Sequence, residues 1–301
     1  MIALAHRLNL PFTPPYDVAA LLAAQRTHAV TGIDAPEFSG STAGETRGTV
    51  ETPDAVITRS IRHNGLFALV RATFRDAHVE LSSSVPVDDG LARRVRRWLD
   101  LDAIPADTAH QLGDDPVIGP LVARRPGLRI FGHIDDVEAA CFAVLGQQVS
   151  LASARTFQRR FVAAYGVRDF ATGYSLLPDA AEIAARDPLE IREAVGLTRS
   201  RAATLHAVAA ELASGLTLDG DPDSIRHRLL GLKGIGPWTA DYLAVRAIGD
   251  RDAFPTGDLV LRRAMGADTA RDAMQRGDAW RPLRAYATFH LWTEYAYCAA
   301  R

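Results

Sequence analysis

One aspartate stands where a fixed negative charge could take part in a reaction. Asp258 follows Gly257 and precedes an apolar, periodic segment that predicts a helix. A carboxylate at a helix start accepts hydrogen bonds from backbone amides and is favoured in its charged form. Such an anion could stabilise developing positive charge or deprotonate a water molecule. Taken alone, the pattern is also explained by a helix cap with no further role.

Two large aromatic residues precede this aspartate on another predicted helix, 237–248. At about 100° per residue, Trp238 and Tyr242 fall roughly opposite the stripe that packs inward. That stripe consists of small and aliphatic residues at helical spacing: Ala240, Leu243, Ala244, Ala247 and Ile248. An aromatic pair on the other face either packs against another part of the protein or lines a cleft, and composition leaves both open.

A glycine-spaced turn joins this helix to the one before it. Gly234 and Gly236 follow a short predicted helix that ends near Leu230, and Pro237 suits the first position of the next helix. Glycines let the backbone approach another surface closely, and amides at a helix start attract anions. The turn predicts either a phosphate-binding hairpin or a plain connection between two antiparallel helices.

The elements that must position these residues fall into two parts. The first 87 residues predict an antiparallel-sheet α+β domain, with Asn64-Gly65 as a hairpin turn. Its elements are a helix at 17–28 and strands at 49–52, 55–63, 66–75 and 78–83. Residues 88–301 predict an all-helical, two-lobed body with the hairpin at about 225–248. Its helices are expected at 88–98, 135–145, 150–165, 179–185, 200–214, 223–230, 237–248, 258–265 and 280–299. The predicted fold class is therefore α+β.

Composition limits the possible protein classes and cellular locations. A net charge of −2 argues mildly against a protein that coats nucleic acid by bulk charge, although the chain from Arg226 onward carries twelve basic residues against eight acidic ones. Cys141 and Cys298 predict neither a disulfide framework nor a four-cysteine cluster. We find no signal peptide pattern and no membrane-spanning run, so we expect a cytoplasmic protein.

The stretch 230–240 resembles the hairpin of the helix-hairpin-helix DNA glycosylase superfamily: leucine, glycine, aliphatic residue, glycine, then Thr-Ala. The resemblance implies that the hairpin, through Gly234, Gly236 and Thr239, binds a DNA phosphate. It also implies that hairpin carbonyls coordinate Na⁺ or K⁺ when DNA is bound. The residues concerned are Leu230, Leu232 and Ile235.

Asp258 lies eighteen residues beyond Ala240, which is the place of the catalytic aspartate in that superfamily. Cleavage of the bond between base and sugar passes through a positively charged sugar, which a fixed anion stabilises. The resemblance therefore implies that Asp258 is catalytic.

Several motifs resemble the AlkA branch, DNA-3-methyladenine glycosylase II. They are 14–17, 125–129, 145–150, 236–242 and 280–292. This resemblance implies a base pocket of Trp238, Tyr242 and Trp292, in which electron-rich rings attract a cationic alkylated purine. It also implies that Gln147 and Gln148 enter the minor groove.

The sequence departs from the branch pattern at three places. Gln148 replaces an apolar wedge, Ala24 and His28 replace an aromatic residue and an arginine, and Gly257 replaces a second aspartate. We therefore expect a differently built pocket rim and a single carboxylate at the site.

Superfamily members that also cut the DNA backbone use a lysine just after the hairpin. Trp238 holds that position here, and Lys233 is the sole lysine of the chain. We predict a monofunctional, monomeric glycosylase with no catalytic cofactor, which acts on duplex DNA with alkylated bases. The alternatives are a bifunctional 8-oxoguanine-type glycosylase/lyase and a helix-hairpin-helix protein that only binds DNA. Phosphate binding alone requires neither Asp258 nor the aromatic face.

Overall fold

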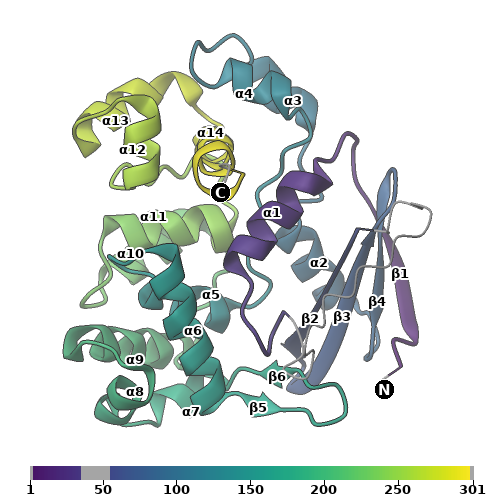
Figure 1. The fold of residues 1–301 in the computed structure, drawn as a ribbon, viewed down its shortest axis with the longest axis vertical. Coiled ribbons are helices and arrows are strands. Elements are labelled where there is room, and N and C mark those ends of the chain that lie inside the picture. Colours follow the sequence, from purple (N-terminus) through teal and green to yellow (C-terminus); the bar gives the residue numbers. More distant parts are fainter. Residues whose placement is uncertain (1–2, 35–54, 299–301) are drawn as a thin grey trace, which may run out of the picture.

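The computed structural model describes residues 3–34 and 55–298. Its N-terminal part contains a four-stranded antiparallel sheet with strand order β1-β4-β3-β2 (Figure 1). The strands are β1 His6–Pro11, β2 Val56–His63, β3 Leu66–Phe74 and β4 His78–Ser83. Asn64 and Gly65 both have positive φ, 49° and 77°, as a tight hairpin turn between β2 and β3 requires. The antiparallel sheet and this turn confirm the prediction.

Two features of the sheet differ from the expected strands. β1 was not predicted, because it is an edge strand on which Leu10 is the buried residue, so it lacks an alternating apolar pattern. The strand predicted at 49–52 lies outside the described residues.

Helices make up most of the remaining chain. In order they are α1 Val18–His28, α2 Asp89–Trp98, α3 Pro105–Leu112, α4 Gly119–Arg124, α5 Asp136–Leu145, α6 Leu151–Tyr165, α7 Ala180–Ala184, α8 Pro188–Val195, α9 Arg199–Ala213, α10 Pro222–Leu230, α11 Pro237–Leu243, α12 Leu259–Met265, α13 Ala270–Arg276 and α14 Arg284–Trp292. A short hairpin of β5 Val167–Arg168 and β6 Ser175–Leu176 follows α6. α3, α4, α8 and α13 were not predicted; each has eight residues or fewer, too few to show a clear period.

The helix predicted at 280–299 is wrong at its start. Trp280 ends a 3₁₀ turn, and Pro282, which has no backbone N–H, separates that turn from α14. Two helices end in wider π-helical turns that sequence periodicity did not indicate. α11 continues into η1 Ala244–Ile248, and α14 continues into η3 Thr293–Tyr297.

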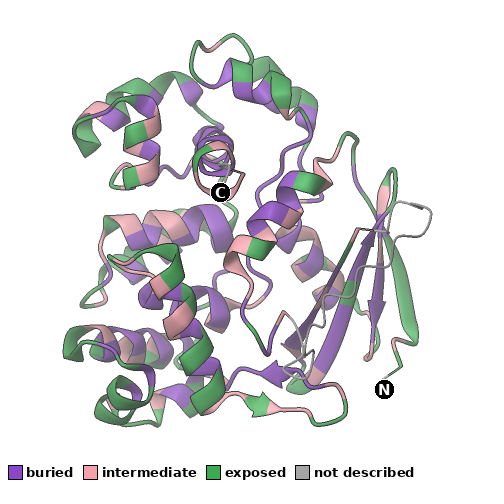
Figure 2. Ribbon diagram, viewed as in Figure 1, coloured by how far each residue is buried: buried purple, intermediate pink, exposed green. Residues whose placement is uncertain are grey.

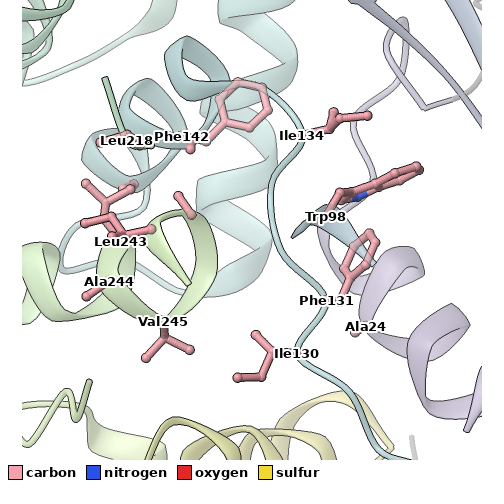
Figure 3. Packing of buried hydrophobic residues seen from close by; sticks show 14 of the residues in the cluster. Ala24, Trp98, Ile130, Phe131, Ile134, Phe142, Leu218, Leu243, Ala244 and Val245 are labelled. Carbon is pink, nitrogen blue, oxygen red and sulfur yellow. The ribbon is translucent and has the colours of Figure 1, made fainter. Parts of the chain in front are cut away.

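The core runs from the sheet into the helical body. α1 lies between the sheet and the other helices (Figure 1), and buried residues concentrate on α5 and α14 (Figure 2). Figure 3 shows Trp98 and Phe131 beside Ala24 of α1, with Phe142 of α5 and Leu243 of α11 farther along the same buried cluster. The predicted inward stripe of α11 is buried throughout, which confirms that its aromatic pair lies on another face. No helix within the described ranges has the length and apolar character to cross a bilayer.

Candidate active site

A cleft of about 1190 Å³ opens between α11, α12 and α14 on one side and α5, α6 and the end of α1 on the other. We call Trp238, Tyr242, Asp258 and Trp292 the aromatic wall. We call His28, Phe142, Gln147, Gln148 and Gln158 the amide wall. Every member of both walls lines this cleft. The fold thus brings together residues that are as much as 264 positions apart (His28 and Trp292).

Asp258 caps α12 and accepts three hydrogen bonds from nitrogen donors. Its Oδ1 accepts from the backbone N–H of Leu261 at 2.9 Å and from the indole N–H of Trp292 at 3.1 Å. Its Oδ2 accepts from the indole N–H of Trp238 at 3.1 Å. These donors hold the carboxylate in one orientation and complement its negative charge. Oδ2 retains a second lone pair for a reacting group, so the cap and the candidate catalytic group are one residue.

The three rings form a continuous apolar surface. Trp238 stacks on Tyr242 with a centroid separation of 5.4 Å, and Tyr242 lies 5.9 Å from Trp292. A base held between two rings needs a separation of about 7 Å, twice the contact distance of carbon atoms. Neither gap admits a base in this structure, so a bound base would stack on the outer face of the rings.

The loop before Asp258 is held by contacts with residues outside the loop. Phe254 makes an edge-to-face contact with Trp280 at 5.8 Å, and Gly277 leaves room for the Phe254 ring. The guanidinium of Arg284 donates to both oxygens of Asp252 at 2.7 and 2.8 Å. Contacts with the segment 277–284 therefore anchor the loop that leads to Asp258.

The hairpin requires glycine at one of its two positions. Gly234 has a φ of +94°, and a Cβ there would lie 1.9 Å from Oγ1 of Thr204. Gly236 has ordinary φ and open space around it. The backbone amides of both glycines donate to no residue within the described ranges, so both remain available to an anion.

The two glutamines of the turn after α5 face in different directions. Nε2 of Gln147 donates to the carbonyl of Gly234 and to Oγ1 of Thr239, both at 3.0 Å. Gln147 and the buried hydroxyl of Thr239 are thus turned toward one another and tie this turn to the hairpin. Gln148 is exposed at the tip, with a φ of +52°.

Sequence reasoning missed a polar cluster at the inner end of the cleft. Nη1 of Arg246 donates to Nε2 of His28 at 3.1 Å, and the hydroxyl of Tyr297 lies 3.2 Å from the same nitrogen. Burial, and then the charge of Arg246, lowers the pKa of His28 well below its ordinary value. Arg246 and Tyr297 belong to the two π-helical turns, which the hydrophobic periodicity of the sequence does not predict. Of the two rim positions, His28 lines the cleft, whereas Ala24 is fully buried in the core.

The hairpin carbonyls offer a partial fit to a monovalent cation. The carbonyls of Leu230 and Ile235 accept no backbone hydrogen bond from a described residue, while that of Leu232 accepts from the N–H of Ile235 at 3.0 Å. A carbonyl oxygen has two lone pairs, so all three retain an acceptor direction.

Comparisons with known proteins agree with this geometry. Residues 7–135 match the family model of the AlkA N-terminal domain, and residues 141–278 match that of the HhH-GPD superfamily of base excision DNA repair proteins. The chain is 31% identical over 294 residues to DNA-3-methyladenine glycosylase 2 of Escherichia coli, covering 94% of this chain and 96% of that protein. It is 43% identical over 210 residues to a probable bifunctional transcriptional activator/DNA repair enzyme AlkA of Mycobacterium tuberculosis, covering 66% of this chain. That match spans 42% of the mycobacterial protein's length.

Solved structures share most of this arrangement of elements. A 3-methyladenine DNA glycosylase from Archaeoglobus fulgidus superposes with a TM-score of 0.76 at 19% identity, covering 95% of this chain and 97% of that one. The apo form of an 8-oxoguanine glycosylase/lyase from Clostridium acetobutylicum superposes with a TM-score of 0.63 at 16% identity, covering 80% and 86%. At these identities the likeness concerns the fold. With the two family models and the Escherichia coli relative, it places the chain in the helix-hairpin-helix superfamily of base excision DNA repair glycosylases, in the branch with an AlkA N-terminal domain.

Proposed function

We propose that the protein is a monofunctional DNA glycosylase that removes alkylated purines of the 3-methyladenine and 7-methylguanine type from duplex DNA. The observation that carries the proposal is the carboxylate of Asp258, fixed by two indole N–H groups beside an apolar ring surface. The names of the Escherichia coli and Archaeoglobus fulgidus proteins support the same substrate class.

The reaction follows from the charges involved. The bond between C1′ and the base nitrogen breaks, and its electron pair leaves with the base. Because an alkylated purine is already cationic, it leaves as a neutral molecule without a protein acid. The carboxylate of Asp258 stabilises the positive charge that develops on the sugar. A water oxygen then bonds to C1′, and Asp258 accepts the proton that the water loses.

We assign DNA binding to the hairpin and to the turn after α5. The free amides of Gly234 and Gly236 receive a phosphate, and Gln148 fills the gap that the flipped nucleotide leaves. Gln147 and Thr239 hold the two elements in register beside the DNA. Na⁺ or K⁺ at the carbonyls of the hairpin would add positive charge beside the phosphate. One monomer suffices to extract one nucleotide.

Lyase chemistry is not part of the proposal. A covalent intermediate with the sugar needs an amine at the site, and none of the described residues that line the cleft is a lysine. Trp238 holds the place of the nucleophilic lysine and bonds Asp258 instead.

Methylated duplex DNA tests the proposal directly. The purified protein is incubated with this DNA, released bases are identified by chromatography, and strand breaks are measured with and without alkali. We expect free methylpurines and breaks that appear only after alkali. Breaks without alkali would establish a lyase and refute the assignment of Trp238. Binding without any release would refute the assignment of Asp258 in alkylation repair.

A further inference from the structure

One polar side chain of the cleft has no part in the chemistry proposed above. Gln158 lies on the same face of α6 as Leu151 and Ala154, and all three line the cleft. The next residues on this face, Phe161 and Val162, are 0% and 2% exposed and belong to the core. Gln158 therefore stands at the inner end of the row, where the cleft closes.

Gln158 is buried without satisfying its amide. The residue is 8% exposed, and its carboxamide makes no hydrogen bond to any residue within 3–34 or 55–298, yet its polar atoms are not closed off from solvent. An amide without a partner inside the protein is free to bond a group that enters the cleft, which an aliphatic side chain in the same wall could not do. A partner that arrives with the ligand explains the choice of glutamine.

The surroundings of Gln158 suit the edge of a flat base. A second cavity of about 20 Å³ lies behind the cleft, and His28, Phe142, Gln158 and Tyr242 line both spaces. These four residues therefore form the inner boundary of the cleft, with two rings and two polar groups. Because the guanidinium of Arg246 can only donate, Nε2 of His28 accepts and the ring proton sits on Nδ1.

We infer that Gln158 reads the edge of the flipped base through two hydrogen bonds. Its carbonyl accepts from an exocyclic amino group, and its amide donates to the adjacent ring nitrogen, the pairing that carboxamides make with N6 and N7 of adenine. The inference rests on the proposed function and narrows its substrate. 3-Methyladenine keeps both groups, whereas 7-methylguanine has a methyl group on N7 and a carbonyl oxygen at C6. Gln158 thus favours adenine lesions and is a specificity-determining residue.

The test compares two lesions in one reaction. Gln158→Met keeps the length of the side chain and removes both hydrogen bonds, and Gln275→Met on the exposed face of α13 is the matched control. Both variants and the unaltered protein are given duplex DNA that contains both methylpurines. For Gln158→Met we expect kcat/KM for 3-methyladenine to fall by about tenfold to a hundredfold, with 7-methylguanine release unchanged. Gln275→Met should leave both rates unchanged.

A second measurement probes the ring nitrogen itself. Free 3-methyladenine and its 7-deaza analogue, which lacks the N7 acceptor, are compared as inhibitors of 7-methylguanine release. The unaltered protein should bind 3-methyladenine more tightly, by roughly tenfold, and Gln158→Met should bind the two equally. Equal loss of both lesions, an unchanged ratio, or no effect of the 7-deaza substitution would each overturn the inference. Failure of the proposed function is distinct, because the unaltered protein would then release neither base.

Discussion

The two walls of the cleft differ in how their polar atoms are used. On the aromatic wall, Asp258 is bonded by Trp238, Trp292 and a backbone amide, so each of these polar groups is paired within the protein. On the amide wall, His28 and Gln147 are also paired within the protein, whereas Gln148 is exposed and Gln158 has an unpaired carboxamide that the cleft can reach. A closed network holds one geometry whatever enters, whereas open groups gain their bonds from the ligand. Under the proposed function, the aromatic wall serves the chemistry common to all lesions, and Gln158 of the amide wall selects among them.

Asp258→Asn tests the aromatic wall most severely. Asparagine remains a good helix cap, so the fold persists, but the charge that stabilises the sugar is lost. We expect single-turnover excision of every lesion to fall by roughly 10²–10³-fold with DNA affinity unchanged. Asp223→Asn, at an exposed carboxylate of α10, is the control. Loss of one lesion alone would break the division between the walls.

Gly234→Ala tests the role of the hairpin independently of the two walls of the cleft. The positive φ and the contact with Thr204 should lower the free energy of unfolding by about 1–3 kcal/mol and weaken DNA binding, without a change in the ratio of lesions released. Gly236→Ala, with open space at its Cβ, should leave stability unchanged. Thermal unfolding of both variants checks the contrast, and equal destabilisation would contradict the geometry.

Trp292→Phe and Trp238→Phe test whether the indole hydrogen bonds to Asp258 contribute to catalysis. Each keeps a ring but removes one donor to the carboxylate, so we expect excision of all lesions to slow by about tenfold, as for other hydrogen bonds to charged groups. Trp98→Phe is the matched control, because its indole nitrogen has no partner among the described residues. Single-turnover rates of excision of both methylpurines test this expectation. A rate that is normal in Trp292→Phe would show that its ring, and not its N–H, matters.

Gln147→Leu and Gln148→Leu should differ although the residues are adjacent. Gln147 ties the turn to Gly234 and Thr239, so its loss should destabilise the protein by about 1 kcal/mol and weaken binding. Gln148 contacts solvent, so Gln148→Leu should leave stability unaltered and affect only binding to DNA with a flipped nucleotide. Urea unfolding and DNA titration measure both. The opposite order of stability would show that Gln148, and not Gln147, braces the hairpin.

Local signals in the sequence predicted the parts of the site that depend on short spacing. The cap at Asp258, the inward stripe of α11 and the Asn64-Gly65 turn each follow from residues a few positions apart. The contact of His28 with Arg246 spans 218 residues and depends on a π-helical turn, so no local period could indicate it. The inward direction of Gln147 and the unpaired amide of Gln158 likewise result from packing of distant helices. The domain boundary at 87 and 88 stays a prediction.

The placement of the tryptophans gives the protein an optical reporter of its own. Of the four indoles in the chain, Trp98 and Trp280 are buried in the core at 0% and 2% exposure, while Trp238 and Trp292 line the cleft and both bond Asp258. Indole emission depends on the polarity around the ring and on its hydrogen bonds. A nucleotide that enters the cleft changes the surroundings of the two site indoles and leaves the other two untouched. Nucleotide flipping can therefore be followed in real time on unlabelled protein and DNA, against a constant background from the interior.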